Sequence, residues 1–174
     1  MADGEAWQIR QAEAEDVSAL SLVATATFLE TFAGVLPGPA IVAHCAKAYA
    51  PEAFAAYLAR GSRAWLAEAA PGRAPVGFAQ LTAPELPGAQ DGDIELKRIY
   101  LLSRFHGTGT GAALMAAAVA GAAGHKRLLL GVYARNARAI AFYRKQGFEP
   151  IGVRQFHVGG QVFHDVVLAR PLVA

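Results

Sequence analysis

A glycine-rich stretch in the second half of the chain constrains the fold more than any other feature. Residues 104–114 read RFHGTGTGAAL, with glycine at positions 107, 109 and 111. A strand-like run (IELKRIYLL, 94–102) precedes the stretch, and an alanine-rich, helix-like run follows it. Glycine adopts backbone angles that other residues resist, and a helix N-terminus presents unpaired N–H groups with a partial positive charge. The stretch therefore predicts an anion-binding loop, most often for phosphate, rather than a plain tight turn.

The common phosphate-binding signatures do not fit this loop. A Walker A loop ends in Gly-Lys-Ser/Thr, and no lysine follows the glycines here. A dinucleotide fingerprint reads Gly-x-Gly-x-x-Gly near the first strand, whereas this loop reads Gly-x-Gly-x-Gly and comes late in the chain. Both of these nucleotide-binding interpretations are therefore weakened.

The hydrophobic pattern of the remaining chain predicts strands and helices on both sides of the loop. Strands are expected at residues 7–12, 63–69, 75–82, 93–102, 127–133, 148–158 and 161–169. Helices are expected from the N-cap Asp16 to near Gly34, at 38–49, at 50–61 with Pro51 at the start and Gly61 at the end, at 112–123, and from Asn136.

The order of these elements predicts the fold class. The strand–helix–strand–helix middle predicts parallel pairing, and hairpins across APGRA (70–74) and Gly159-Gly160 predict antiparallel flanks. We expect an α/β (α+β) fold: a mixed, twisted sheet of about six to seven strands with helices on both faces. The length of 174 residues fits a single domain spanning 1–174.

Composition excludes several classes of protein. No apolar run approaches the ~18 residues that span a membrane, and no secretory signal is visible. Cys45 is the only cysteine, so no internal disulfide can form and a cytoplasmic location is expected. A net charge of +2 without a basic cluster argues against nucleic acid as a partner.

Two motifs in order carry a resemblance to a known family. The loop at 106–111 and the later run NARAIAFYRKQGFEPIG (136–152) together resemble the GCN5-related N-acetyltransferase (GNAT) superfamily. The acetyl-coenzyme A loop of that family reads Gln/Arg-x-x-Gly-x-Gly/Ala. Gly109 and Gly111 match it, and His106 stands where the family usually has Gln or Arg.

The resemblance implies a GNAT fold, acetyl-CoA as co-substrate, no metal, and transfer of the acetyl group to a primary amine of a small molecule. It also implies the cofactor-binding residues, which lie on the strand before the loop, in the loop and at the start of the later helix: Ile99, Tyr100, Leu101, His106, Gly107, Thr108, Gly109, Thr110, Gly111, Ala112 and Asn136.

A narrower similarity concerns the acceptor. The runs IELKRIYLL, LLLGVYARNARAIAFYRKQGF, VFHDVVLARPL and TFLETFAG are similar to a bacterial branch that includes polyamine (spermidine/spermine) N-acetyltransferases. Acetylation of a protein N-terminus or lysine is the alternative activity. A non-catalytic acyl-CoA-binding module is the alternative class, and a homodimer is left open.

Tyr143 is the candidate general acid. On a helix that starts at Asn136, the residues Ala139, Ile140, Phe142 and Tyr143 fall within roughly 160° of arc and face inward. From the residues alone, Tyr143 fits a core tyrosine whose hydroxyl bonds a backbone carbonyl. The resemblance implies instead that it protonates the leaving thiolate, and that the N-cap Asn136 also binds the pantetheine arm.

The strand at 93–102 carries an expected irregularity. Ile94 and Leu96 share one face, so in a regular strand Ile99 and Leu101 fall on the other. One extra residue between the two pairs, a β-bulge, puts all four on the same face. A central strand buried on both faces needs no bulge, and this alternative stays open. The resemblance implies that the strand is bulged.

Glu95 of this strand is the candidate general base. Some branches of the family, the histone acetyltransferases among them, have a catalytic glutamate at this place, and a carboxylate takes a proton directly or through water. The alternative is a solvated glutamate paired with Lys97.

Other polar side chains are candidates for binding the amine that accepts the acetyl group. Asp91, Asp93 and Glu95, with Glu30, are candidates for an acidic entrance that attracts a cationic amine. His157 and His164 straddle the final hairpin and are candidates for lining the acceptor pocket, but their spacing fits no common zinc motif.

Overall fold

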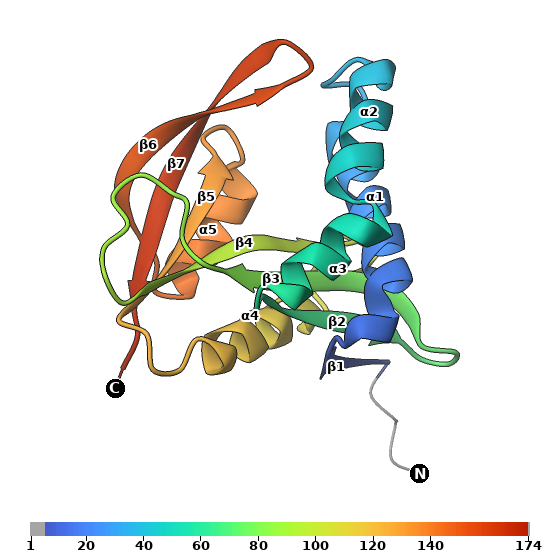
Figure 1. Cartoon of the computed structure of the whole chain (residues 1–174), viewed down its shortest axis with the longest axis horizontal. Helices are drawn as coiled ribbons and strands as arrows, with labels where there is room; N and C mark the ends of the chain where they lie inside the picture. The colour runs from blue at the N-terminus through green and yellow to red at the C-terminus, as the bar shows by residue number, and fades with distance from the viewer. Residues whose placement is uncertain (1–5, 174) are drawn as a thin grey trace.

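The computed structural model describes residues 6–173, which form one seven-stranded sheet with five α-helices (Figure 1). The strands are β1 (Trp7–Gln11), β2 (Arg63–Ala69), β3 (Ala74–Thr82), β4 (Asp93–Leu101), β5 (Arg127–Tyr133), β6 (Glu149–Val158) and β7 (Gln161–Pro171). The helices are α1 (Val17–Phe32), α2 (Gly38–Ala48), α3 (Pro51–Ala59), α4 (Thr110–Gly121) and α5 (Ala137–Lys145). Short 3-10 turns cover Ala14–Asp16 and Ser103–Phe105.

The strand order is β1-β2-β3-β4-β5-β7-β6, and β4 with β5 is the one parallel pair in it. The predicted mixed sheet with antiparallel flanks is therefore confirmed. The final hairpin turns at Gly159 and Gly160, both at positive φ (57° and 75°), as a two-residue turn of this kind requires.

Helices cover both faces of the sheet, as predicted. One buried cluster joins α4 and α5 to the sheet and includes Leu114, Met115 and Tyr143. A second cluster, on the opposite face, joins α1, α2 and α3 to it and includes Phe28 and Phe54. The two clusters use alternate side chains of the same strands, such as Trp65 and Leu66 of β2, because successive strand residues point to opposite faces.

The predicted helix ends are confirmed except in one detail. Gly34 and Gly61 follow α1 and α3 at positive φ, where glycine carries no steric penalty. Asp16 does precede α1, but its side chain does not cap the helix. Its carboxylate instead pairs with Arg10 at 2.7 Å, which lowers the pKa of Asp16 to about 2. The guanidinium of Arg10, on β1, donates two hydrogen bonds to this carboxylate and is a stronger partner than a backbone N–H at the helix start.

The bulge in β4 is present. Gln80 of β3 pairs with Arg98, while the next residue, Leu81, pairs with Leu96, so Lys97 is the extra residue. Ile94 and Leu96 before the bulge, and Ile99 and Leu101 after it, consequently pack in the same cluster below α4 and α5. Tyr100 faces the opposite cluster. The bulge thus keeps the apolar side chains of both halves of β4 on the face of the sheet that α4 and α5 cover.

The two parallel strands pair only over a short distance. Asp93–Glu95 of β4 pairs with Arg127–Leu129 of β5, and beyond these residues β5 continues against β7 as far as Tyr133. The second half of β4 therefore has no partner on that side. At the paired end, Arg127 Nη2 donates to Asp93 Oδ2 at 2.6 Å, and the Asp93 side chain is only 1% exposed. The hydrogen bond from Arg127 lowers the pKa of Asp93.

We expect Asp93→Asn to lower the free energy of unfolding by about 2 kcal/mol at neutral pH, because it leaves a half-buried guanidinium unpaired. The pKa of Asp93 is depressed in the folded protein, so its contribution is present above the ordinary pKa of 3.8 and is lost as the pH falls toward the folded value. The deficit of the variant should accordingly shrink in acid. Urea unfolding at several pH values measures both effects. Asp91→Asn, at an exposed neighbour, is the control, and an equal loss in both variants would contradict the account.

Candidate active site

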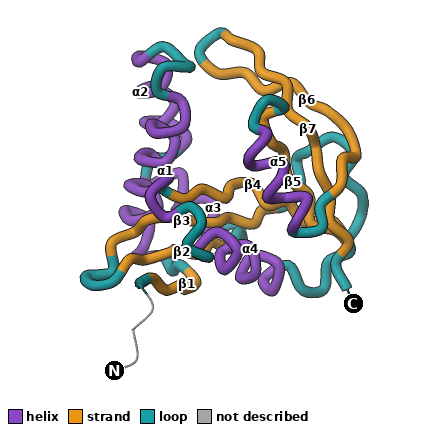
Figure 2. The backbone as a smooth tube through the Cα atoms, turned by 180° about the vertical axis from the view of Figure 1, so that it is seen from behind, coloured by secondary structure: helices purple, strands orange, loops and turns teal. Residues whose placement is uncertain are grey.

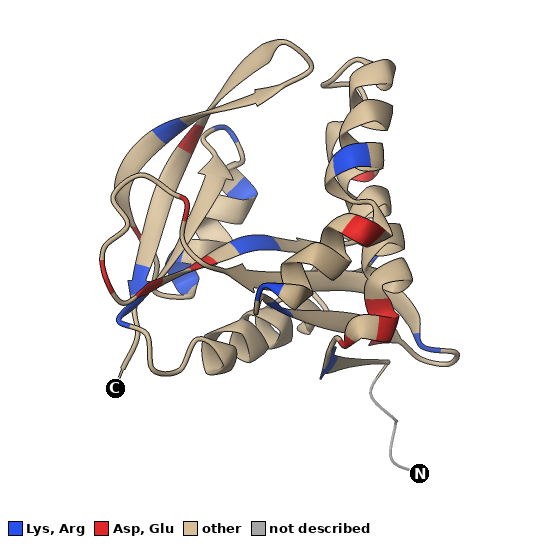
Figure 3. Cartoon of the chain, in the orientation of Figure 1, with Lys and Arg blue, Asp and Glu red and all other residues tan. Residues whose placement is uncertain are grey.

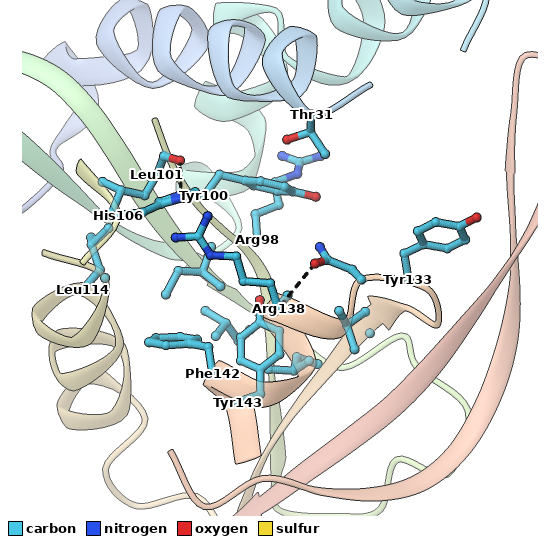
Figure 4. A pocket seen from close by; sticks show the side chains of 18 of the residues that line it. Thr31, Arg98, Tyr100, Leu101, His106, Leu114, Tyr133, Arg138, Phe142 and Tyr143 are labelled. Atoms are coloured by element: carbon cyan, nitrogen blue, oxygen red, sulfur yellow. Dashed lines mark hydrogen bonds between the residues drawn. The ribbon is translucent and has the colours of Figure 1, made fainter. Parts of the chain in front are cut away.

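A cavity of about 720 Å³ opens where β4 and β5 part (Figure 4). Its walls come from the end of α1, the bulged half of β4, the loop before α4, the second half of β5 and the first turns of α5. These segments lie far apart in the sequence and meet only because the two strands separate. The cavity has the size of a small-molecule site.

The predicted glycine loop forms one end of this cavity. Gly107 and Gly109 have φ angles of 79° and 89°, and Gly107, Gly109, Gly111 and Ala112 line the wall. The first N–H groups of α4, on Thr110, Gly111 and Ala112, have no acceptor among the described residues. Unpaired amides at a helix N-terminus are the groups that bind a phosphate, and phosphate binding at this loop stays a prediction.

Side chains around the loop hold its shape. The Nε2–H of His106 donates to the carbonyl oxygen of Leu101 at 3.0 Å, which ties the loop to the end of β4. The hydroxyls of Thr108 and Thr110 lie 2.7 Å apart, and Thr108 Oγ1 also donates to Phe105 O. His106 lines the cavity, whereas the two threonine side chains are occupied within the loop.

The bulged half of β4 forms the floor. Ile99, Tyr100 and Leu101 all line the cavity. Since β5 no longer pairs with β4 beyond Glu95, the backbone edge of these residues is open to a bound molecule. The three residues predicted to contact the thioester end of the co-substrate therefore lie together beside the loop.

Asn136 and Tyr143 approach from α5. The Oδ1 of Asn136 accepts a hydrogen bond from Ala139 N at 3.1 Å, which confirms the predicted N-cap. Tyr143 is 9% exposed, and its hydroxyl has no hydrogen bond to any residue from 6 to 173. Figure 4 shows this hydroxyl pointing into the cavity. Burial, with a smaller effect of Tyr100, raises the pKa of Tyr143, so the phenol keeps its proton at neutral pH.

Glu95 lies outside the group that lines the cavity. It is 3% exposed, and its Oε2 accepts a hydrogen bond of 2.7 Å from the backbone N–H of Glu85. Lys97, the alternative partner, pairs with the Glu85 side chain instead. The sequence-based alternative of a solvated glutamate paired with Lys97 is therefore wrong.

The other residues predicted to bind the accepting amine do not lie together in the cavity. Asp93 is paired with Arg127, and Asp91 is exposed and does not line the cavity. His157 and His164 are exposed on the final hairpin and also lie outside the lining. Glu30 does line the cavity, where its carboxylate accepts hydrogen bonds from the N–H and hydroxyl of Ser103.

Sequence reasoning missed the basic side chains of the lining. Arg138 of α5 lies outside the predicted inward arc, on the solvent side of the helix, but its side chain reaches along the cavity toward the loop that carries His106 (Figure 4). Arg135 and Arg98 also line the cavity. The helical arc alone could not place Arg138, because a long side chain in the first turn extends beyond the face on which its Cα lies.

Within residues 6–173, no group of three or more His, Cys, Asp or Glu side chains is placed to hold a metal ion. In the same part of the chain, no helix combines the length and the apolar character that crossing a membrane requires.

The site combines a glycine loop at a helix N-terminus, two parallel strands that separate, and a tyrosine that faces the cavity. This combination is typical of acetyl-CoA-dependent N-acetyltransferases. The chain belongs to the acetyltransferase (GNAT) family, whose model matches residues 36–148. Uncharacterized N-acetyltransferases of Mycobacterium tuberculosis and Mycobacterium bovis are 43% identical to it over 122 residues, which cover 69% of this chain and 74% of theirs.

Solved structures share the fold. PaiA N-acetyltransferase from Thermoplasma acidophilum, in complex with coenzyme A, is similar with a TM-score of 0.75 and 22% identity over 95% of this chain and 98% of that one. Ribosomal-protein-alanine N-acetyltransferase from Brucella melitensis reaches a TM-score of 0.70 and 24% identity over 95% and 99% of the two chains. The Brucella protein is named for a ribosomal-protein alanine, and the PaiA protein is described with coenzyme A. The narrower likeness of this chain to polyamine acetyltransferases stays a prediction.

Phosphate binding at the loop can be tested by introducing a negative charge at Gly109. Asparagine and aspartate have nearly the same shape and both tolerate the left-handed backbone of Gly109 better than other residues do. We expect Gly109→Asn to retain part of the rise in melting temperature that coenzyme A produces, and Gly109→Asp to abolish it, since a carboxylate repels the phosphates. Differential scanning fluorimetry measures both. An equal shift in the two variants would show that no phosphate lies at the loop.

Proposed function

We propose that the enzyme transfers the acetyl group of acetyl-CoA to a primary amine of a small molecule, by direct attack of the amine on the thioester. The observation that carries the proposal is the Tyr143 hydroxyl, which is unpaired and faces the cavity beside the open edge of β4. The alternative of a core tyrosine bonded to a backbone carbonyl has no such bond to support it among the described residues.

The lining offers a place for each part of the co-substrate. The free amides of Thr110 to Ala112 suit the pyrophosphate, and Arg138 adds positive charge at the same end. The exposed backbone of β4 suits the amide groups of the pantetheine arm, which runs toward Tyr143, with Asn136 on the facing helix. The order of these groups along the cavity follows the order of chemical groups in the molecule.

The reaction needs little beyond positioning and one proton donor. The neutral amine attacks the carbonyl carbon, a C–N bond forms, and the tetrahedral intermediate loses a proton from nitrogen to water or, through water, to the candidate base Glu95. The C–S bond then breaks, and the sulfur takes the proton of the Tyr143 hydroxyl, which is regained from solvent. Because burial raises the pKa of Tyr143, its hydroxyl stays protonated at neutral pH, so it is available to the leaving sulfur and cannot be the base that takes the proton of the amine.

The final hairpin favours a small acceptor over a protein chain. Figure 2 shows the tip of the β6–β7 hairpin reaching toward α2. Val158, beside the tip, is buried in the same cluster as Ile41 of α2, and a Cβ added to Gly159 would lie 2.6 Å from the Ala40 Cβ. This contact joins the hairpin to α2, so an extended peptide has less room to pass between these two elements than a small amine has.

The charges give less support to a polyamine. Among the described residues that line the cavity, Glu30 is the single carboxylate, and it is held by Ser103. Basic side chains lie on β4 and α5, which flank the cavity (Figure 3). Spermidine and spermine therefore enter our proposal as acceptors to be tested within an amine panel. Homodimer formation and a cytoplasmic location likewise stay predictions.

The decisive variant is Tyr143→Phe. It keeps the ring and its contacts with Phe142 and Phe148, so coenzyme A should raise the melting temperature as in the natural enzyme. We expect the turnover number to fall by ~10²-fold, the lower range for a positioned acid, because a thiolate is a tolerable leaving group. Thiol release with acetyl-CoA and a panel of amines provides the measurement. Near-normal turnover would assign Tyr143 to the core alone. Tight coenzyme A binding without turnover of any amine would support the non-catalytic module.

Glu95 as the base needs a separate test. Its carboxylate lies outside the cavity lining, so as a base it would take the proton through water. Glu95→Gln preserves an oxygen that can accept from Glu85 N–H. If Glu95 is the base, the variant should lose activity at neutral pH and regain it as the amine deprotonates by itself at high pH. The pH profile of kcat/KM distinguishes this from a structural role, which predicts the same fractional loss at every pH.

A further inference from the structure

Arg98 occupies an unusual position at the bulge of β4. Its guanidinium carbon lies 4.8 Å above the ring of Tyr49, 5.5 Å from that of Tyr57 and 5.6 Å from that of Phe54. These rings belong to α3 and the segment before it, so Arg98 points to the face of the sheet opposite Tyr143. Arg98 also lines the cavity, and Figure 4 shows its guanidinium on the side of Thr31 and Tyr100.

The guanidinium is held but not neutralised. Its Nη1 donates to Gln80 Oε1 at 3.0 Å, and Gln80 is 1% exposed and fixed opposite Arg98 in the β3–β4 ladder. No carboxylate among residues 6–173 forms an ion pair with Arg98, and its other N–H groups have no acceptor in that part of the chain. By contrast, the adjacent cation, Lys97, is paired with Glu85 at 2.8 Å.

Such an arrangement suits recognition of an anion. A guanidinium has five N–H donors in a planar fork that matches a carboxylate bidentately, and stacking on aromatic faces fixes the plane without using those donors. Gln80 and the three rings restrict the rotamers of Arg98 before any ligand binds, so less side-chain entropy is lost on binding. The same positive charge opposes a cationic amine at this point of the cavity.

We propose that Arg98 binds a carboxylate of the acceptor, so that the substrates are amines that also carry a carboxylate, such as amino acids. The inference rests on the proposed function and narrows its acceptor class. The acceptor amine lies at the open edge of β4, within reach of the thioester. Its carboxylate lies toward α1 and α3, against the free N–H groups of Arg98. The amine is presented for attack because the carboxylate is fixed at Arg98 while the amine reaches the open edge of the same strand.

Pairs of acceptors that differ only in the carboxylate test the proposal on the whole enzyme. Suitable pairs are lysine with cadaverine, phenylalanine with phenethylamine, and 4-aminobutyrate with propylamine, and spermidine is added as the polyamine. We expect kcat/KM, read by thiol release from acetyl-CoA, to favour the carboxylate-bearing member of at least one pair by ~10-fold or more, the factor that charge-assisted hydrogen bonds supply. The difference should lie mainly in KM, because the contact is made before and during the reaction.

Variants at Arg98 then separate recognition from folding. Arg98→Gln should erase the preference by lowering kcat/KM for the carboxylate-bearing member alone. Arg98→Lys keeps the charge but not the fork, and should leave an intermediate preference. Arg60→Gln is the matched control, since Arg60 also stacks on Tyr57, at 5.0 Å, but lies outside the cavity lining. The shift in melting temperature with coenzyme A shows that each variant is folded.

The outcomes distinguish the two claims. Equal or faster turnover of spermidine and of the amines without a carboxylate would overturn the role of Arg98 and leave acetyl transfer intact. An equal loss for both members of a pair in Arg98→Gln would reduce Arg98 to a structural residue, and also overturn the proposal. Absence of turnover with every amine would refute the proposed function, and the inference about its acceptor with it.

Discussion

The short parallel pairing of β4 with β5 is the constraint on which the site depends. Three residues of each strand pair, closed by the bond between Asp93 and Arg127, and then the strands separate because β5 follows β7. A strand inside a sheet normally pairs its backbone N–H and C=O groups with neighbours on both sides. Where one side of such a strand is unpaired, these groups require another hydrogen-bond partner. In this protein the gap opens onto a cavity whose walls come from both faces of the sheet. The space for a substrate is therefore a consequence of sheet topology.

The bulge at Lys97 makes the two faces of β4 chemically different at the point where the strands part. The leucine and isoleucine side chains stay in the core below α4 and α5, while Arg98 and Tyr100 are directed to the face covered by α1 and α3. A single extra residue thus directs neighbouring side chains of β4 to opposite faces of the sheet, where we propose that the co-substrate and the acceptor bind. This division of labour explains why Tyr143 and Arg98 line one cavity from opposite faces.

Much of this arrangement was predictable from local pattern. The glycine loop and the inward face of α5 follow from spacing, because backbone angles and side-chain periodicity are local properties. Spacing left the bulge open, and the family resemblance implied it. The fate of individual charges was not predictable. Glu95 accepts a hydrogen bond from a backbone N–H ten residues earlier, Asp16 pairs with Arg10 across two elements, and Arg138 bends from the solvent side into the cavity. Such contacts depend on tertiary geometry, which a sequence pattern does not contain.

The central claim is that the parted strands hold acetyl-CoA with its sulfur beside Tyr143. A crystal structure of the enzyme with coenzyme A tests it most directly. The account predicts phosphates on the amides of Thr110 to Ala112, the pantetheine arm along Ile99 to Leu101, and the sulfur about 3.5 Å from the Tyr143 hydroxyl, within hydrogen-bonding range for sulfur. Coenzyme A bound elsewhere, or bound in the cavity with its sulfur directed away from Tyr143, would contradict the account.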